Sequence, residues 1–372
     1  MKIAVIGVGG TGSAACRHLA KTGHEVVGFE RFRLDHNNGS SHGESRIIRY
    51  TYPDLLYTRM MAEAYPLWSE LEEEAGEELL VRCGGVYLGP ESHPQLQRTE
   101  AALRETGLAY QRLTAGALQD RFPALRLLPG EVALYQTESG FLRSSRCVLA
   151  NACLAQKHGA TLYEETEVTE IVSRTEEVVV CTANAGEFRF DRVIVTTGAW
   201  MGALFAQLNL PLTVTRQQVA YLQIAQNSAH FEPGRLPVWI DKTHGYYGFP
   251  SDGSLPGVKL ASHDLGAIVT PENVERTIDA AYLEQVRGVA ARRLPDLGPE
   301  VTFSTTCLYT NTPNEDFILD HAPDAHRVLL VSGCSGHGFK FTILLGKIAA
   351  DLTTGAGYTG DLSRFALQQF TT

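Results

Sequence analysis

Residues that could carry chemistry gather at the two ends of this 372-residue chain. Near the N-terminus the chain reads Gly7-Val8-Gly9-Gly10-Thr11-Gly12, which has the spacing of a phosphate-binding loop. Near the C-terminus it reads Cys307-Leu308-Tyr309-Thr310 and then Ser335-Gly336-His337-Gly338-Phe339-Lys340-Phe341. A nucleotide-binding loop at one end, and a cysteine, a histidine and a lysine among glycines at the other, indicate one cofactor site built from both ends.

Each glycine of the N-terminal loop has a separate function in such a site. Gly7 allows the tight turn, Gly9 lets a pyrophosphate approach the backbone, and Gly12 lets the following helix pack closely on the strand. The helix that begins at this loop offers free N–H groups to the anion. The loop therefore predicts dinucleotide binding, since a glycine-rich turn that binds nothing would not need this spacing.

The residues after the loop narrow the choice of dinucleotide. Glu30 follows Gly12 by eighteen positions, where a carboxylate can accept hydrogen bonds from ribose hydroxyls. A negative charge there disfavours a 2′-phosphate, so NADP is the weakest candidate. A pure NAD enzyme has no use for the glycine-rich segment 333–338, whereas a helix that begins behind it can face a flavin ring and stabilise negative charge on it. FAD is the favoured cofactor.

The elements that must position these residues follow from hydrophobic patterns and turn residues. Residues 3–6 and 25–30 predict buried parallel strands, joined by a helix that ends near Gly23. Residues 35–45 are rich in Gly, Ser, Asn and His, and predict an irregular loop. Further strands are predicted over 79–88, 131–136, 161–163, 168–173, 178–182, 193–197 and 328–333. Further helices are predicted around 60–71, 95–104, 144–158, 274–293 and 339–353, with Ser144 or Ser145 as the cap of the third of these.

This order of elements predicts an α/β (α+β two-domain) fold, in which a Rossmann-like FAD-binding domain is interleaved with a substrate domain built on a mixed or antiparallel sheet. The FAD-binding domain is expected over 1–78, 141–212 and 308–372. The substrate domain is expected over 79–140 and 213–307.

Composition excludes several other classes of protein. A net charge of −10 argues against nucleic acid or an anionic membrane as a partner. The seven cysteines contain no CxxC pair, so neither a zinc site nor a disulfide framework is expected. Residues 2–6 follow Met1 without a basic leader, and no apolar run approaches the length of a membrane span. A reduced, cytoplasmic, soluble protein is expected.

Four segments together resemble the sarcosine oxidase and N-methyltryptophan oxidase family, within the D-amino acid oxidase-like flavoproteins. They are Ser41–Arg49, Tyr246–Pro250, Cys307–Tyr309 and Ser335–Phe341, and they occur in the order in which that family has them. The resemblance covers essentially the whole chain.

By this resemblance, Cys307 carries the flavin through a covalent bond from its sulfur. Without the resemblance, a small buried hydrophobic residue would be the favoured interpretation of Cys307. Cys334 is the competing attachment point, and we expect it to pack at a strand end instead. The other cofactor-binding residues that the resemblance and the loop imply are Gly7, Gly9, Gly10, Thr11, Gly12, Glu30, Arg31, Ser40, Ser45, Arg46, Val168, Gly198, Trp200, Gly336, Gly338, Phe339 and Lys340.

The resemblance also implies a substrate site. Arg49 and Lys340 would hold a carboxylate, because a guanidinium can bind both oxygens while the ammonium adds a point charge. Lys259 would promote the reaction of the reduced flavin with oxygen. Each has an alternative interpretation: a solvated loop arginine, a helix-surface lysine and an edge-strand lysine that extends to solvent.

The remaining candidates are histidines, tyrosines and an arginine near the expected ring. Arg46, His42, Tyr247 and His263 join Lys259 in the catalytic set, while Tyr309 and His337 join Arg49 and Lys340 in substrate binding. The histidines could instead be structural and the tyrosines could pack in a core, which we expect for Tyr246. Ala261 and Ser262 depart from the family pattern, and Trp239 is expected near the pocket entrance.

The resulting hypothesis is a monomeric flavin-dependent oxidase of a secondary amino acid, such as sarcosine or N-methyltryptophan. It would form an imine that hydrolyses to an amino acid and an aldehyde, while O2 is reduced to H2O2. A cyclic imino acid or a primary amine as substrate, and an electron acceptor other than oxygen, stay open as alternatives. A pure NAD enzyme and a nucleotide-binding protein without catalysis are further alternatives.

Overall fold

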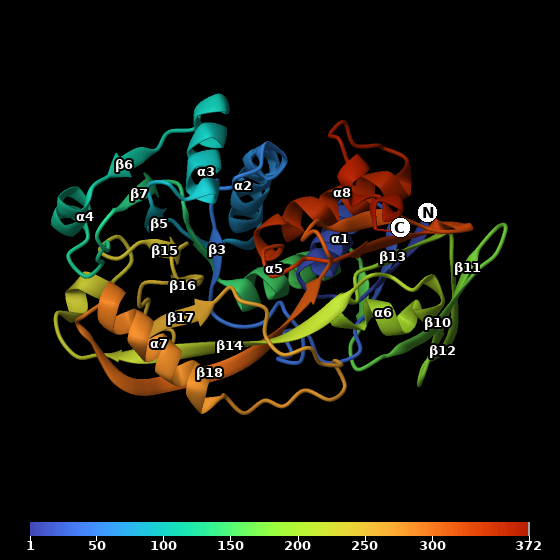
Figure 1. Cartoon of the computed structure of the whole chain (residues 1–372). Coiled ribbons are helices and arrows are strands. Elements are labelled where there is room, and N and C mark those ends of the chain that lie inside the picture. Colours follow the sequence, from blue (N-terminus) through green and yellow to red (C-terminus); the bar gives the residue numbers. More distant parts are fainter. Residues whose placement is uncertain (371–372) are drawn as a thin grey trace.

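A computed structural model describes residues 1–370, in which two large sheets lie next to one another (Figure 1). The first sheet has six strands in the order β19-β20-β13-β1-β2-β9, parallel except at the β19–β20 edge. Its members are β1 (Lys2–Ile6), β2 (Glu25–Phe29), β9 (Thr161–Tyr163), β13 (Arg192–Val195), β19 (Ile318–Ala322) and β20 (Ala325–Ser332). Segments far apart in sequence therefore form one Rossmann-like sheet.

The uninterrupted apolar sequence of β1 is explained by burial on both faces of the sheet. Ile3 and Val5 pack into the core beneath the helices, whereas Ala4 and Ile6 pack against a small three-stranded sheet on the other face. The helices of the first face are α1 (Gly10–Lys21), α5 (Ser144–Lys157) and α8 (Thr342–Thr354), and α2 (Leu55–Ala75) packs outside them. The small sheet consists of β10 (Val168–Ser173), β11 (Val178–Thr182) and β12 (Gly186–Phe190).

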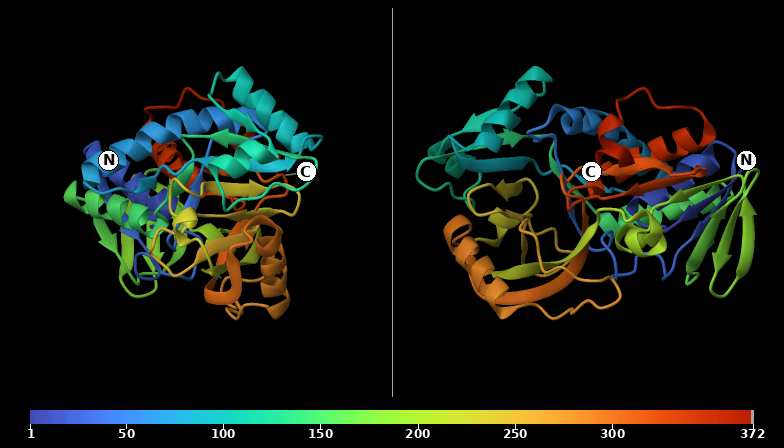
Figure 2. Two further views of the ribbon diagram at one scale, coloured as in Figure 1. Left: turned by 90° about the vertical axis from the view of Figure 1, so that its left-hand side faces the viewer. Right: turned by 45° about the vertical axis from the view of Figure 1, so that its right-hand side comes forward.

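The second large sheet has eight strands in the order β18-β14-β17-β16-β15-β5-β7-β6, and only β5 and β15 pair in parallel. Its members are β5 (Gly85–Pro90), β6 (Gln111–Leu113), β7 (Glu131–Gln136), β14 (Thr213–Ile224), β15 (Val238–Asp241), β16 (Tyr246–Gly248), β17 (Val258–Ser262) and β18 (Leu297–Asn311). Its outer face is covered by α4 (Ala115–Arg121) and α7 (Ala280–Arg293), while α3 (Pro94–Glu105) packs against β5 (Figures 1 and 2).

Short elements complete the chain between these layers. A third small sheet consists of β3 (Arg46–Ile48), β8 (Gly140–Leu142) and β4 (Leu80–Val81). The short helices are α6 (Met201–Leu204), η1 (Gly198–Trp200), η2 (Ala206–Leu208), η3 (Ser228–Phe231), η4 (Phe339–Phe341), η5 (Ser363–Phe365) and η6 (Leu367–Gln369). Within residues 1–370, no helix combines the length and the apolar character that a membrane crossing requires.

The two-domain α/β architecture expected from the sequence is confirmed by the two sheets. The long strands β14 and β18 pair along most of their length and run from the eight-stranded sheet towards the first one (Figure 1). The domain boundaries stay a prediction, and β18 runs across the one expected between residues 307 and 308.

Four local predictions are wrong. Ser144 is the first residue of α5 rather than its cap, and its hydroxyl donates to Gly43 O at 2.6 Å. The strand expected over 79–88 is interrupted, because β4 and β5 belong to different sheets. Helix α7 begins at Ala280 rather than near residue 274.

The fourth error concerns Trp239. Its indole is fully buried in the core between the eight-stranded sheet and α7, where its ring atoms lie against Gly248. A Cβ on Gly248 would lie 2.6 Å from that ring. Trp239 therefore packs in the core and does not lie at a pocket entrance.

A buried ionic network ties α7 to the sheet. Arg293 donates to Glu131 Oε1 at 2.7 Å and to Asp241 Oδ2 at 2.8 Å, and all three side chains are almost fully buried. Burial opposes ionisation of the Glu131 carboxyl, but its hydrogen bonds from Arg293, Thr243 and Leu128 N–H outweigh that effect and lower its pKa. The network thus depends on the positive charge of Arg293 and on the negative charges of its carboxylate partners.

Glu131→Gln is expected to destabilise the protein by about 3 kcal/mol, because it leaves the buried Arg293 short of negative charge. Urea unfolding of the holoenzyme checks this value. The matched control is Glu284→Gln, which removes an exposed partner of Arg287 and should change stability by about 1 kcal/mol or less. Equal effects of the two substitutions would contradict a stabilising function for the network.

Candidate functional site

Two cavities of about 360 and 350 Å³ open between the sheets and share part of their lining. We call them the first chamber, at the carboxyl ends of β1 and β2, and the second chamber, against the eight-stranded sheet. The residues that line both are Gly9, Ser40, Ser41, His42, Thr196 and Gly198. The two chambers therefore adjoin, and together they extend from the glycine loop to the C-terminal motifs.

The glycine loop has the close approaches that the spacing predicts. Gly7 has a φ of +87°, and a Cβ there would lie 2.7 Å from Thr196 O. A Cβ on Gly12 would lie 1.8 Å from Gly7 O, so no larger residue fits between loop and helix. The first-turn amides of α1 have no partners inside the helix, and Gly10 N donates to Ser41 Oγ at 3.0 Å. Gly10 and Thr11 line the second chamber. This geometry can bind an anion such as a pyrophosphate.

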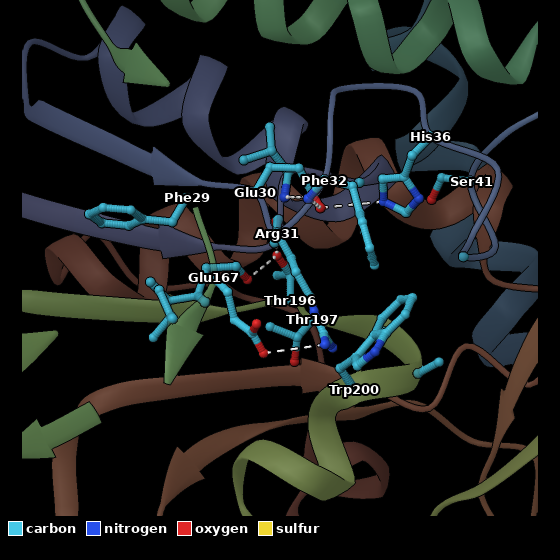
Figure 3. A pocket seen from close by; sticks show the side chains of 18 of the residues that line it. Phe29, Glu30, Arg31, Phe32, His36, Ser41, Glu167, Thr196, Thr197 and Trp200 are labelled. Atoms are coloured by element: carbon cyan, nitrogen blue, oxygen red, sulfur yellow. Dashed lines mark hydrogen bonds and ion pairs between the residues drawn. The ribbon is translucent and has the colours of Figure 1, made fainter. Parts of the chain in front are cut away.

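Glu30 lies at the wall of the first chamber, as Figure 3 shows. Its carboxylate accepts hydrogen bonds from Val8 N at 2.9 Å and Phe32 N at 3.1 Å, and lies 3.3 Å from His36 Nε2. These contacts fix the carboxylate at the chamber wall. Binding of ribose hydroxyls by Glu30 stays a prediction.

Aromatic rings and a charged rim surround the rest of the first chamber (Figure 3). The rings of Phe32 and Trp200 have centroids 5.4 Å apart, and the Arg31 guanidinium lies 5.8 Å from the Trp200 ring. Arg31 also pairs with Glu167 at 3.4 Å. Val168 lines the same chamber. A flat heterocycle suits this slot, since one side is aromatic and the other polar.

Lys259 is buried in the second chamber, in the interior strand β17. Its Nζ donates to Ser45 O at 2.8 Å and to Ser45 Oγ at 3.2 Å, and lies 4.5 Å from the Phe249 ring. Burial, followed by the nearby Arg46, lowers the pKa of the ammonium well below its usual value. The interpretation as an edge lysine that extends to solvent is wrong.

Arg46 organises the loop that connects the two chambers. Its guanidinium donates to Ser45 O at 2.9 Å, Ser40 O at 2.8 Å and His42 O at 2.7 Å. Burial and then Arg46 lower the pKa of His42 to about 3, so this imidazole is neutral at pH 7. Its Nε2 is buried and has no hydrogen-bond partner among the described residues, which leaves it available to a ligand.

Arg49 and Lys340 both line the second chamber and share Tyr52 as a neighbour. Lys340 Nζ donates to Tyr52 OH at 3.0 Å and to His337 O at 2.6 Å, while the Arg49 guanidinium lies 4.1 Å from the Tyr52 ring. Arg49 also donates to Thr51 O. Burial and then Arg49 lower the pKa of Lys340 well below its usual value. Within residues 1–370, neither cation has a carboxylate partner in ion-pair range, so the pair favours an anionic ligand.

His263 and His337 are neutral. Burial, followed by nearby cations, lowers the pKa of each to about 3. Both ring nitrogens of His337 have protein partners: Nδ1 lies 3.2 Å from Tyr52 OH and Nε2 lies 3.0 Å from Glu315 O. Tyr52 also contacts Arg49 and Lys340, the pair that we call the clamp. His263 instead packs against the Tyr247 ring, with centroids 4.6 Å apart.

Tyr247 and Tyr309 form an aromatic wall of the second chamber, with their hydroxyls 3.4 Å apart. Gly336 lets the C-terminal segment approach this wall, since a Cβ there would lie 2.3 Å from the Tyr309 ring. Tyr246 is buried in the core beside Trp239, as expected.

Two cysteines line the second chamber. Cys307 in β18 is almost fully buried; burial raises the pKa of its thiol, while Arg46, Lys259 and Arg276 act against that rise. Cys334 follows β20, lies against Gly338, and has a pKa raised to about 11 by burial. Fewer cations act on Cys334, so its thiol loses its proton less readily to form a thiolate.

The sequence interpretation missed several residues of the site. Ser41 binds Gly10 N, Thr196 Oγ1 donates to Gly7 O at 2.6 Å, and Arg276 donates to Asn38 O at 2.9 Å. Ser41 is the first residue of the segment Ser41–Arg49, so its position in that segment, together with its hydroxyl, could have indicated a function in the site. No group of three possible metal-binding side chains occurs in the part of the chain that the structure describes.

Comparisons with known proteins agree with this arrangement. The FAD dependent oxidoreductase family matches residues 2–352. A monomeric sarcosine oxidase from Streptomyces avermitilis is 36% identical over 94% of this chain and 92% of its own. An N-methyl-L-tryptophan oxidase from Citrobacter koseri is 31% identical over 99% of this chain and 98% of its own. The solved structure of NikD, described as an unusual amino acid oxidase essential for nikkomycin biosynthesis, has a TM-score of 0.86 and 26% identity, over 98% of this chain and 96% of that one.

Proposed function

This chain belongs to the FAD dependent oxidoreductase family, and from that premise we propose that it oxidises secondary amino acids such as sarcosine or N-methyltryptophan. It is an FAD-dependent amine oxidase, and a small-molecule amino acid is its substrate. The imine product hydrolyses to a primary amino acid and an aldehyde. Electrons pass to O2, which gives H2O2.

The residues present fit FAD. The loop at Gly7 and Gly12 has no room for side chains. The α1 amides can donate hydrogen bonds to a ligand, and the buried Nε2 of His42 can accept or donate one, depending on its tautomer. The two adjoining chambers, the first aromatic and the second cationic, suit a nucleotide joined to a second ring system. We therefore assign the adenosine portion to the first chamber and the flavin ring to the second.

The binding residues of FAD in this proposal come from both ends of the chain. They are Gly7, Gly9, Gly10, Thr11, Gly12, Glu30, Arg31, Ser40, Ser45, Arg46, Val168, Gly198, Trp200, Gly336, Gly338, Phe339 and Lys340, with Cys307 as the covalent attachment. These residues would hold FAD, which would supply a two-electron acceptor for the C–H bond next to the amine nitrogen and a route for those electrons to oxygen.

The chain positions the substrate through its carboxylate. Arg49 and Lys340 would bind the two oxygens, and the neutral His263 and His337 add no competing charge. The aromatic wall of Tyr247 and Tyr309 would exclude water from the amine. Positioning of this kind supplies much of the rate in such a reaction.

The amine must lose its proton, because its lone pair becomes the second bond of the imine. Arg49, Lys340 and Lys259 place positive charge around the amine, which favours its neutral form. No side chain near the clamp has to act as a strong base. Lys259, fixed by Ser45, would stabilise negative charge that develops on oxygen.

We also propose a cytoplasmic monomer. The relatives named monomeric sarcosine oxidase favour a single chain. All seven cysteines lie in the described residues and none is in a disulfide, which is typical of a reducing compartment.

The observation that carries the proposed function is the pair formed by the half-buried Arg49 and the buried Lys340, which has no carboxylate partner within residues 1–370. Arg49→Ala or Lys340→Ala should lower kcat/KM for sarcosine roughly tenfold to a hundredfold, since each removes a charge-assisted contact of about 1.5–3 kcal/mol. Binding of acetate, followed through the flavin absorbance, should weaken in parallel. Equal turnover of sarcosine and its uncharged amide by the unmodified enzyme would contradict the clamp.

A further inference from the structure

Lys242 lies next to the second chamber, one residue beyond β15 and just outside the chamber's lining. It directly follows β15, and its N–H donates to Leu88 O at 2.9 Å, which extends the pairing with β5 by one residue. Successive side chains of a strand point to opposite faces. Asp241 points to Arg293 on the core side, so Lys242 lies on the same side as Ile240, which lines the second chamber.

The Lys242 ammonium shares an aromatic neighbour with the carboxylate clamp. Its Nζ lies 5.8 Å from the centre of the Tyr87 ring, and the Arg49 guanidinium lies 5.7 Å from the same ring. Burial and then Arg49 lower the pKa of Lys242, while Glu315 and Asp241 act in the opposite direction. Lys242 also contributes to the lowered pKa of His263. The amine therefore acts on the clamp region.

Three cations gather here without a carboxylate in ion-pair range. Across residues 1–370, the ammonium of Lys242 makes neither a hydrogen bond nor an ion pair, and the side chain is only partly exposed. Arg49 and Lys340 are likewise without carboxylate partners. A single substrate carboxylate can be bound by two of these groups, so the third is left over. Three neighbouring cations repel one another, and a ligand with two negative charges offsets more of that repulsion than a ligand with one.

We propose that Lys242 is a specificity-determining residue that selects amino acids with a second carboxylate in the side chain, such as N-methylaspartate. This inference rests on the proposed function, since the clamp fixes the first carboxylate. Lys242 would bind the second one beside Tyr87, just outside the lining of the chamber. Among the acids, the exposed Glu315 has the larger effect on the pKa of Lys242, and its carbonyl also contacts His337. A substrate carboxylate would add a second negative charge near Lys242.

The test compares kcat/KM for N-methylaspartate and N-methylasparagine, which differ only in the side-chain charge. The unmodified holoenzyme should prefer the acid by about tenfold or more. Lys242→Met should remove this preference and leave kcat/KM for sarcosine within about threefold, whereas Lys242→Arg should keep the preference. Lys157→Met, which removes an exposed lysine of α5, is the matched control for net charge. No preference in the unmodified enzyme, or an undiminished preference in Lys242→Met, would overturn the inference.

Failure of the inference can be told apart from failure of the proposed function. Turnover of sarcosine without a preference for the acid would overturn only the function of Lys242. If no N-methyl amino acid is oxidised, the proposed function fails. Binding calorimetry of the resting holoenzyme then tests whether Lys242 binds a second carboxylate. Succinate should then bind more tightly than butyrate, and Lys242→Met should abolish the difference; equal binding of the two would overturn the inference as well.

Discussion

Replacing Cys307 with Ala is expected to release the flavin completely when the holoenzyme is denatured in acid, while the unmodified protein should retain it. Cys307 lines the second chamber, and three cations act on its thiol from nearby: Arg46, Lys259 and Arg276. Positive charge favours the thiolate, which is the form that makes a bond to carbon. Precipitation in acid, followed by the absorbance of pellet and supernatant, measures the bound fraction.

Cys334→Ala is the matched control, because Cys334 lines the same chamber and is also buried beside Gly338. This variant should keep its flavin in the pellet. Release from Cys334→Ala but not from Cys307→Ala would move the attachment to the other cysteine. Release from the unmodified protein would mean that the flavin is bound without a covalent bond.

The second large effect is expected for Lys259→Met in the reaction with oxygen. The ammonium is buried, held by Ser45, and lies against the Phe249 ring, so its charge acts in a medium of low polarity. Methionine keeps most of the side-chain length and loses the charge. Reoxidation by oxygen should slow by about a hundredfold or more. Stopped-flow absorbance of the reduced enzyme mixed with oxygen gives this rate.

Anaerobic reduction by sarcosine provides the internal control for Lys259→Met. The clamp of Arg49 and Lys340 remains in place, so reduction should fall much less than reoxidation. Should reduction collapse while reoxidation stays fast, Lys259 would belong to the substrate site. Arg46, which lies in the same cavity wall, would then be the next candidate for the reaction with oxygen.

Much of the first chamber could be predicted from the sequence because its geometry depends on local rules. The spacing of Gly7, Gly9 and Gly12 requires a turn without side chains, and the structure leaves no room for a Cβ at Gly7 or Gly12. The apolar sequence of β1 predicts burial on both faces, and both faces are covered. In each case the residue types alone state the requirement, although the segments that meet it, such as Thr196 beside Gly7, lie far away in the chain.

Features that depend on distant contacts could not be predicted in this way. Trp239 precedes the Tyr246–Pro250 segment in the chain. Its place in the core depends on the packing of α7 against the sheet, which the local sequence does not indicate. Ser144 has the residue type of a helix cap, but its hydroxyl binds the carbonyl of Gly43, about a hundred residues away. Lys242 lies in an ordinary turn sequence, and its relation to Arg49 appears only when β15 is placed beside β5.

The site residues of the second chamber were proposed from the resemblance, and the structure brings them to one cavity. The sequence also allowed an interpretation as exposed side chains for Lys259, Arg49 and Lys340. Residue type cannot decide between the two interpretations, because they differ in access to solvent. Lys259 and Lys340 are buried, and Arg49 lies against Tyr52. Their functions stay predictions that the variants above test.

The most direct test of the proposed function is the anaerobic titration of the purified holoenzyme with single amino acids, followed by admission of oxygen. Sarcosine, N-methyltryptophan, N-methylaspartate, pipecolate, proline and glycine make up the panel. We expect N-methyl amino acids to bleach the flavin absorbance and oxygen to restore it, with one H2O2 formed per amino acid oxidised. Bleaching by glycine or proline alone, or bleaching that oxygen does not reverse, would contradict an oxidase of N-methyl amino acids.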